Sequence, residues 1–355
     1  MYFKINKRII SENSQTYFIA DIAANHDGNL DKAFELIYEA KKAGADAAKF
    51  QHFSAETIVS AKTFSSMKKQ LSHQSKWKKS VFQVYKDASL NLNWTKKLHN
   101  ECRKVGIDFF TSPYSHELVD HVDSYVPAYK IGSGDITWIE IVKYISQKNK
   151  PVILATGASS LRDVKRAVSV INKYNSKICL MQCNTNYTAD KSNLKFINLN
   201  VLKTYKKIFK KKVILGLSDH THGHASVLGA IALGARVIEK HFTLSNKFVG
   251  PDHKFSMNPL TWKEMIETAR ELEMTLGNNQ KKVEKNELQT VIVQRRSMHL
   301  IKDYKKGKEI NIKDMFPLRP SPAGSVQPYE IKKLKNKKLK KNKFKGDILL
   351  WKDLK

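Results

Sequence analysis

Several features that mark other classes of protein are scarce in this chain. Only three of its 355 residues are cysteine, Cys102, Cys179 and Cys183, and their spacing matches no disulfide framework, metal site or redox motif. No apolar run approaches the roughly 18 residues of a transmembrane helix, and Met1–Ser14 is too polar and Lys-rich for a secretory signal. We therefore expect a soluble, cytoplasmic protein with no membrane partner, whose cysteines fill the core.

Arginine is also scarce, and this affects how the high positive charge is interpreted. The net charge is +30, but only nine of the 63 basic residues are arginine, and the lysines are spread along the chain. A nucleic-acid-binding face would gather its basic residues and add aromatic or arginine side chains that read bases. We therefore expect no nucleic-acid partner, while a dispersed positive field favours small anionic substrates.

Glycine-rich phosphate loops are missing as well. No P-loop sequence occurs, and the only dinucleotide-like stretch, Gly132-Ser133-Gly134, has Thr137 where the third glycine of a Rossmann fingerprint would stand. The sequence therefore does not predict a Rossmann domain.

What the chain does contain is a regular alternation of short apolar runs with helical segments. Apolar residues follow helical spacing over Leu30–Gly44, Asn93–Val105, Ala225–Gly234 and Trp262–Leu276, the last being the expected eighth helix. Eight strand–helix units at this length predict an α/β fold, a TIM (β/α)8 barrel. The expected strands are Tyr17–Ala23, Ala47–Gln51, Asp108–Tyr114, Ala128–Gly134, Pro151–Ala158, Lys177–Asn184, Ile214–His220 and Val237–His241.

Two segments depart from this alternation. Residues 52–90 form a long connection after the second strand, and we expect it to act as a lid, because long connections in compact domains are usually functional. A polar linker over residues 279–289 leads into 290–355, where short alternating runs and the Pro-rich stretch Pro317–Gly324 predict a small β-rich domain. The barrel domain is expected to span residues 1–278.

Polar residues recur where the predicted strands end. His220 and His241 end neighbouring strands, and Asp252 follows shortly after. Because the carboxyl ends of parallel strands share one edge, these groups should converge, and burying two imidazoles without partners would be costly. Lys49 and Lys130, with several hydroxyl groups, suit a ligand that carries a phosphate and a carboxylate.

Eight motifs, in order along the chain, together carry a family resemblance. They are FIADIAANHDGNL, ADAAKFQ, FFTSPY, AYKIGSGD, VILATGA, GLSDHT, VIEKHFT and GPDHKFSMNP. They resemble the N-acetylneuraminate (sialic acid) synthase family, and the tail containing Leu318-Arg319-Pro320 resembles that family's SAF, or antifreeze-like, domain. The resemblance covers nearly the whole chain and is specific for the family, but much less specific for the sugar.

The resemblance implies a transferase that joins phosphoenolpyruvate to an open-chain N-acetylated hexose, N-acetylmannosamine or a diacetamido-trideoxyhexose. The products would be a nine-carbon sugar acid and phosphate, which leaves by C–O cleavage. A divalent metal, Mn²⁺ or Mg²⁺, would be bound by His220 and His241. The family's domain-swapped homodimer would let Arg319 contact the sugar in the other subunit's barrel.

The resemblance also implies roles for individual residues. Asp21 is the first and Glu239 the second candidate for the carboxylate that stabilises a cation-like centre during the reaction. The phosphoenolpyruvate carboxylate would be held by Lys49, Thr111 and Lys130, its phosphate by Ser133, Thr156, Asn184, Thr185 and Ser218, and the sugar by Gln51, Tyr187 and Asp252.

Two departures from the family pattern stand out. The family usually has Glu at the position of Asp21, and Ala155 replaces a serine that commonly helps to bind phosphate, a role that Thr156 or the Gly157 amide could take. His222 and His224 are expected to be surface residues. Two alternative functions stay open: a related synthase that acts on a sugar phosphate, and a non-catalytic barrel that binds polyanions.

Overall fold

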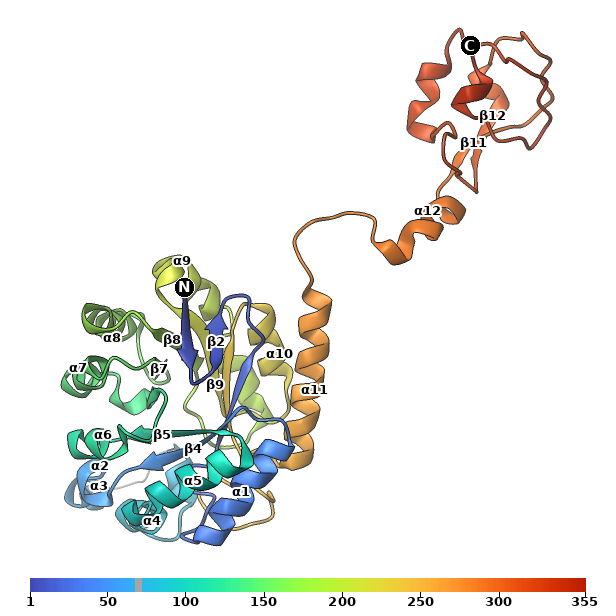
Figure 1. The fold of residues 1–355 in the computed structure, drawn as a ribbon. Helices are drawn as coiled ribbons and strands as arrows, with labels where there is room; N and C mark the ends of the chain where they lie inside the picture. Colours follow the sequence, from blue (N-terminus) through green and yellow to red (C-terminus); the bar gives the residue numbers. More distant parts are fainter. Residues whose placement is uncertain (68–71) are drawn as a thin grey trace. The chain divides into compact units, whose positions relative to one another are not determined.

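The chain forms two units, each with a core of its own. The computed structural model describes residues 1–67 and 72–355 (Figure 1). The first unit spans Met1–Gly277 and the second spans Asn278–Lys355.

Eight parallel strands form the centre of the first unit. Hydrogen-bonded pairing runs in the order β5-β4-β3-β10-β9-β8-β7-β6, and the end strands β5 and β6 lie against each other. The predicted TIM-like barrel of an α/β protein is thus confirmed, with six of the eight strands somewhat shorter than expected. Their bounds are β3 Tyr17–Asp21, β4 Ala47–His52, β5 Asp108–Pro113, β6 Tyr129–Ile131, β7 Val152–Ala155, β8 Ile178–Cys183, β9 Ile214–Asp219 and β10 Val237–His241.

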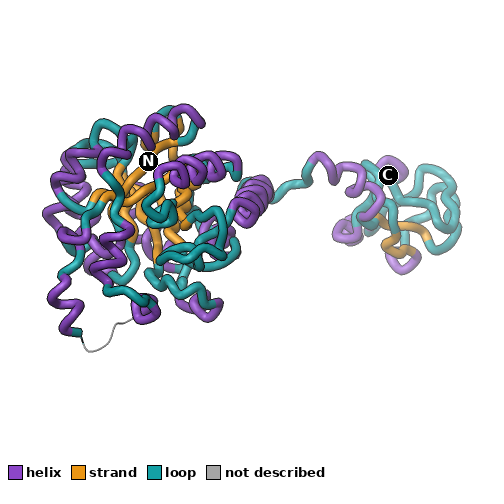
Figure 2. The backbone as a smooth tube through the Cα atoms, turned by 90° about the horizontal axis from the view of Figure 1, so that it is seen from below, coloured by secondary structure: helices purple, strands orange, loops and turns teal. Residues whose placement is uncertain are grey.

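Helices follow the strands and surround them (Figure 2). Some of their starts are capped by side chains: Ser160 caps α8, and Asn258 caps α11, which begins with Pro259. The bounds are α1 Leu30–Lys42, α5 Thr95–Val105, α6 His116–Val122, α7 Ile139–Gln147, α8 Leu161–Tyr174, α9 Val201–Phe209, α10 Ala225–Ala232 and α11 Pro259–Leu276. None of the helices within residues 1–67 and 72–355 combines the length and apolar character needed to cross a bilayer.

Side chains along the barrel strands alternate between two hydrophobic cores. Outward positions pack under the helices, whereas inward positions such as Tyr17 and Phe110 form a separate cluster inside the barrel. An N-terminal hairpin, β1 Tyr2–Ile5 and β2 Arg8–Ser11, adds Phe3, Ile5 and Ile10 to this inner cluster. The hairpin therefore fills the amino end of the barrel, and the inward positions near the carboxyl ends are left for polar groups.

The long connection after β4 contains short helices. They are α2 Ala55–Ile58, α3 Ala61–Ser66, a 3₁₀ turn over Ser72–Lys76, and α4 Val81–Ala88. The part of the expected lid at residues 68–71 lies outside the described residues. The described parts are close to the barrel mouth, since Phe53 and Tyr85 from this connection contact each other and Phe53 contacts Tyr114, just after β5.

The second unit is built on an antiparallel pair of strands. β11 Ser297–Leu300 pairs with β12 Met315–Leu318, and its own apolar cluster includes Met298, Val326 and Leu349. Helix α12 Leu288–Gln294 precedes this pair.

Candidate active site

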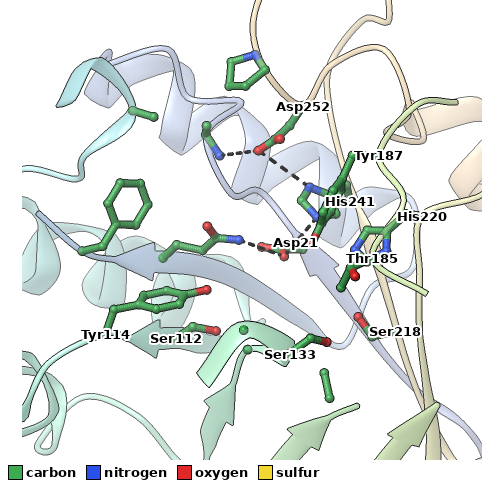
Figure 3. Close-up of a pocket in the computed structure, with 18 of the residues that line it drawn as sticks. Asp21, Ser112, Tyr114, Ser133, Thr185, Tyr187, Ser218, His220, His241 and Asp252 are labelled. Atoms are coloured by element: carbon green, nitrogen blue, oxygen red, sulfur yellow. Dashed lines mark hydrogen bonds and ion pairs between the residues drawn. The ribbon is translucent and has the colours of Figure 1, made fainter. Parts of the chain in front are cut away.

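A cavity of about 530 Å³ lies at the carboxyl ends of the barrel strands. Polar side chains from several strands converge on it (Figure 3). Its position is the one where α/β barrels hold their chemistry. Of the residues predicted for the site, those that line it are Asp21, Lys49, Gln51, Lys130, Ser133, Thr185, Tyr187, Ser218, His220, Glu239, His241 and Asp252.

Two buried lysines and two buried carboxylates form the floor of the cavity. Lys49 on β4 pairs in register with Asp21 on β3, and its Nζ lies 2.7 Å from Asp21 Oδ2 and 3.9 Å from Glu239 Oε1. Lys130 Nζ lies 3.3 Å from the same Glu239 oxygen. Burial alone would lower the pKa of Lys49, but the charges of Asp21 and Glu239 outweigh it and raise that pKa. Lys49 is therefore a permanent cation on the floor.

Three buried polar atoms at the cavity have no hydrogen-bond partner among the described residues. They are Ser112 Oγ, Glu239 Oε2 and His241 Nδ1. Buried polar atoms in native proteins are nearly always bonded, and each one left without a bond costs about 1–3 kcal/mol. Because all three belong to residues that line one cavity, the site has hydrogen-bonding capacity that a polar ligand can use.

Two imidazoles stand side by side at the ends of β9 and β10. The ring centroids of His220 and His241 are 5.3 Å apart. The Nδ1 of His220 lies 2.8 Å from the carbonyl oxygen of Asn184, which can only accept, so Nδ1 carries a proton. Burial disfavours the charged form of this ring, but the charge of Cys183 and the hydrogen bond with Cys183 outweigh burial and raise the pKa of His220. Burial lowers the pKa of His241 well below its usual range, so this ring is neutral.

These imidazoles fit a divalent metal in their donor chemistry. An imidazole whose Nδ1–H is bonded to a backbone carbonyl presents Nε2 as the atom that can bind a metal, and His241 Nδ1 is a buried nitrogen without a hydrogen bond. Within residues 1–67 and 72–355 no three His, Cys, Asp or Glu side chains gather around one point. A metal held here by His220 and His241 would therefore take its other ligands from water or substrate.

A second buried ion pair lies directly behind the two histidines. Asp219 and Lys240 are opposite each other on β9 and β10, each 1% exposed, and Lys240 Nζ lies 2.5 Å from Asp219 Oδ2. Lys240 also donates to the carbonyl of Thr221 (2.6 Å), and Ser226 Oγ donates to Asp219 (2.5 Å). This network ties together the two strand ends that carry His220 and His241.

Two further carboxyl groups line the cavity, and both have raised pKa values. Burial raises the pKa of Asp252 to about 6, although the Ala24 amide donates to its carboxylate at 3.2 Å. Burial likewise raises the pKa of Asp135 to about 6, against the opposing charge of Lys130. Both groups therefore change charge near neutral pH, as groups in active sites often do.

Just after β7, the backbone at Gly157 lies close to hydroxyl groups of the site. The Gly157 amide donates to Ser133 Oγ at 2.9 Å, and a Cβ at Gly157 would lie 2.5 Å from Thr185 Cγ2 and 3.0 Å from Cys183 Sγ. Only glycine fits there. The Ser133 and Thr185 hydroxyls line the cavity here and suit an anion such as phosphate.

Three residues predicted for this cavity, Thr111, Thr156 and Asn184, do not line it. Thr111 faces away from the barrel interior, and its hydroxyl is bonded to His52 Nδ1 (2.6 Å) and the carbonyl of Phe50 (3.1 Å). The Thr156 hydroxyl donates to the Met181 carbonyl (2.7 Å).

Asn184 is held elsewhere by its own hydrogen bonds, and the prediction that Arg319 contacts the sugar in the other subunit's barrel stays a prediction. The Asn184 side-chain amide donates to the Phe196 carbonyl at 3.3 Å, and its backbone carbonyl accepts from His220. Arg319 belongs to the second unit, where its Nε donates to the Gln294 carbonyl at 2.7 Å.

The predicted site did not include several residues that line the cavity. Ser112, Tyr114 and Asp135 all contribute to it, and so does Cys183, which was expected to be core filling. Cys102 and Cys179 do lie in the hydrophobic cores. An additional wall comes from the connection after β4 and consists of Phe53, Ile58, His73, Trp77, Val84, Tyr85 and Ala88.

Comparison with known proteins identifies both units. The NeuB family matches residues 36–281, and the SAF domain matches residues 295–355. An N,N'-diacetyllegionaminic acid synthase of Legionella pneumophila is 34% identical over 355 residues, with 98% of this chain and 97% of that protein covered. The enzyme of the same name from Campylobacter jejuni is 35% identical over 323 residues, covering 89% and 94%.

A solved structure supports the same assignment. The N-acetylneuraminic acid (sialic acid) synthetase of Leptospira borgpetersenii, in complex with citrate, superposes with a TM-score of 0.71 at 26% identity, covering 82% of this chain and 95% of that one. The chain therefore belongs to the NeuB family of sialic-acid-type synthases, and its C-terminal unit is a SAF domain.

Proposed function

We propose that this protein condenses phosphoenolpyruvate with the open-chain form of an N-acetylated hexose to give a nine-carbon sugar acid and phosphate. The observation that carries the proposal is the convergence, in one cavity, of two buried lysines with two imidazoles. Lys49 and Lys130 provide cations for an anionic substrate, and His220 and His241 lie across the same space. The names of the two similar legionaminic acid synthases support the same reaction type.

The reaction needs one new C–C bond and one broken C–O bond. C3 of phosphoenolpyruvate attacks the aldehyde carbon, and the aldehyde oxygen gains a proton. The positive charge that develops at C2 is taken up by addition of water, after which the bond between C2 and the phosphate oxygen breaks. The water supplies the proton balance: the aldehyde oxygen becomes a hydroxyl, C2 becomes a ketone, and phosphate leaves as its monoprotonated dianion.

The side chains of the cavity fit the separate parts of this reaction. Lys49 and Lys130 would bind the carboxylate of phosphoenolpyruvate, together with Ser112, whose buried hydroxyl has no partner among the described residues. The carboxylate of Asp21 or Glu239 would stabilise the positive charge at C2 from the floor.

The phosphate and the sugar would occupy other walls. Ser133, Thr185 and Ser218 provide hydroxyl groups for the phosphate, beside the close backbone at Gly157. Gln51, Tyr187 and Asp252 remain for the hydroxyl and acetamido groups of the sugar. The histidines would hold a divalent cation, Mn²⁺ or Mg²⁺, which when bound polarises the aldehyde as a Lewis acid.

The proposed active form is a domain-swapped homodimer. Arg319 is exposed on the SAF domain. We propose that it contacts the sugar bound in the other subunit, so that each site is completed by two chains.

Phosphate release tests the proposal most directly. The purified protein, supplied with Mn²⁺ and phosphoenolpyruvate, is expected to release phosphate only when an N-acetylated hexose is present. Mass spectrometry should then detect the acid formed by adding a three-carbon unit to the sugar. Lys130→Met serves as the inactive control, and Lys263→Met, on the exposed face of α11, as the active one. Phosphate release that is independent of any sugar, or that persists in Lys130→Met, would contradict the proposal.

A further inference from the structure

A fully buried histidine, His253, follows the cavity residue Asp252 but does not line the cavity itself. Both of its ring nitrogens have partners. Nδ1 lies 2.6 Å from Thr243 Oγ1, and Nε2 lies 3.1 Å from each carboxylate oxygen of Asp27. A carboxylate can only accept, so Nε2 carries a proton. The ring therefore links the connection after β10 to the connection after β3.

A second hydrogen bond joins the same two connections. The Ala24 amide donates to Asp252 at 3.2 Å, so two successive residues, Asp252 and His253, are bonded to the connection after β3. Burial would raise the pKa of Asp27, but hydrogen bonds from His253 and Lys32 outweigh it and lower that pKa. Asp27 is therefore an ionised acceptor, and hydrogen bonds to ionised groups are among the stronger ones in proteins.

The backbone is packed tightly around this contact. A Cβ at Gly250 would lie 2.8 Å from His253 Cδ2 and 3.2 Å from Asp27 Oδ1. The His253 ring is 0% exposed and has little room to move aside. Residues 250–256, called the 250–256 loop below, can therefore follow this path only with glycine at its start.

Side-chain amides support the rest of the 250–256 loop. Asn246 Nδ2 donates to the carbonyls of His253 (2.9 Å) and Ser256 (2.6 Å). Asn25 Nδ2 donates to Ser256 Oγ at 2.9 Å, and this hydroxyl donates to the Asp252 carbonyl at 2.7 Å. Buried polar networks whose members are bonded favour one arrangement of the chain over others.

The loop carries two side chains that reach the proposed sugar and metal sites. Asp252 lines the cavity, and its Oδ2 lies 3.9 Å from His241 Nδ1 (Figure 3). The buried ring of Phe255 has its centroid 4.9 Å from that of His241 and 6.1 Å from that of His220. Aromatic contacts of this kind constrain ring orientation. A shift of the loop would therefore move a sugar-binding carboxylate and release two imidazoles together.

We propose that His253 is a positioning residue, which fixes the 250–256 loop through its hydrogen bond to Asp27. The fixed loop turns Asp252 toward the sugar and packs Phe255 against the two imidazoles. The inference rests on the proposed condensation reaction and adds a residue to that site. Phosphoenolpyruvate would bind on the floor, which β3, β4, β6 and β10 provide, so its binding should not depend on the loop.

Replacing His253 by alanine should separate the two substrates. Misplaced sugar-binding groups and loosened metal ligands each cost about 10- to 100-fold, so His253→Ala should lower kcat/KM for the sugar by that factor. Mn²⁺ affinity, measured by calorimetry, should fall as well. The dissociation constant of phosphoenolpyruvate, measured in the same way, should stay unchanged. An equal loss of phosphoenolpyruvate affinity would indicate general damage to the barrel and overturn the inference.

Two amide substitutions show which hydrogen bond matters. The longer side chain in His253→Gln brings an amide nitrogen near the position of Nε2, where it can donate to Asp27. The shorter one in His253→Asn brings its amide near Nδ1 and Thr243 instead. We expect His253→Gln to retain most sugar use and Mn²⁺ affinity, and His253→Asn to behave like His253→Ala. Equal behaviour of the two amide variants would overturn the role given to Asp27.

Matched variants separate positioning from stability. Tyr17→Phe removes another buried hydrogen bond, from the Tyr17 hydroxyl to Asp108 Oδ2 at 2.5 Å, but at the amino end of β3. It should leave sugar use and Mn²⁺ affinity unchanged, whereas Gly250→Ala should reproduce the losses of His253→Ala. Losses in Tyr17→Phe as large as those in His253→Ala would overturn the inference.

A variant at the other end of the hydrogen bond covers the case in which His253→Ala does not fold. The Asp27 side chain is 34% exposed, so Asp27→Ala leaves no cavity in the core, and it should show the same separation of sugar from phosphoenolpyruvate. Wild-type sugar use in Asp27→Ala would overturn the inference and leave the proposed reaction intact. Absence of turnover in the wild-type protein would overturn the proposed reaction, whereas the Mn²⁺ affinities of these variants would still show whether His253 fixes the loop.

Discussion

Replacing Lys240 by methionine should destabilise the barrel and loosen the proposed metal site at the same time. Methionine keeps the length and apolar stem of lysine but removes the cation that pairs with Asp219. Both partners are 1% exposed, so Asp219 would be left as a buried charge. Removing one partner of a buried ion pair typically costs about 3–5 kcal/mol. Two hydroxyl donors to Asp219 remain, those of Ser226 at 2.5 Å and Thr221 at 3.0 Å, so we expect about 3 kcal/mol, the low end of that range.

The loss should depend on pH in a definite direction. In the wild-type protein burial would raise the pKa of Asp219, but the charge of Lys240 outweighs it and keeps that pKa below its usual value. The pair therefore stabilises the fold above the unfolded pKa, and this stabilisation is lost as pH falls through the folded pKa. In Lys240→Met burial is no longer opposed, and the pKa of Asp219 rises. The difference between the two proteins should thus be largest at neutral pH and shrink toward acid.

Urea unfolding, followed by circular dichroism, measures the loss, and hydrogen exchange of the β9 and β10 amides assigns it to the barrel. Lys263→Met is the matched control, because Lys263 and its partner Glu267 are each 62% exposed and such pairs contribute about 0–1 kcal/mol. Asp219→Asn combined with Lys240→Met should recover part of the loss. A decrease below about 1 kcal/mol in Lys240→Met, with unchanged Mn²⁺ affinity, would refute the reasoning that this pair holds the two histidines in place.

Three further outcomes are expected. His241→Ala should abolish metal-dependent turnover and weaken Mn²⁺ binding measured by calorimetry. Full activity of the wild-type protein after chelation would show that the reaction does not need a metal. Because the pKa of Asp252 is raised to about 6, its carboxylate is ionised above that pH, so the KM for sugar should rise about tenfold between pH 7 and pH 5. The rise should be absent in Asp252→Asn, and a flat profile in the wild type would argue against this role. Arg319→Ala should raise the KM for sugar but barely change the KM for phosphoenolpyruvate. Mixing the Arg319→Ala chain with a Lys130→Ala chain should restore activity if the subunits complete each other's sites. Verified heterodimers that recover no activity would contradict the swapped arrangement.

The barrel could be predicted from the sequence because its signal is local. Apolar runs and helical spacing placed all eight strands, and polar residues at strand ends located most of the cavity. The error at Thr111 came from neglecting strand periodicity. Phe110 belongs to the inner cluster, so with a period of two the next inward residue is Ser112, not Thr111. The same period of two predicts that Cys183 faces inward and that its neighbour Gln182 faces outward.

Other parts of the site depend on contacts between distant segments and leave no local pattern. The wall formed by Trp77 and Tyr85 is distinguishable from a solvated Lys-rich helix only once the segment is seen against the barrel mouth. Asn184 shows the same limitation. Its neighbour Thr185 lines the cavity, while Asn184 itself bonds the Phe196 carbonyl, and the turn that decides between them is irregular.

The N-terminal hairpin has a consequence for the order of events in the proposed reaction. Phe3, Ile5 and Ile10 seal the amino end of the barrel, so both reactants and both products must pass through the mouth. A reactant that binds at the floor, beside Lys49 and Lys130, has to enter before the one that lies above it. Steady-state kinetics should therefore be sequential and ordered, with phosphoenolpyruvate first. A large excess of sugar should slow turnover by occupying the mouth of the barrel before phosphoenolpyruvate enters.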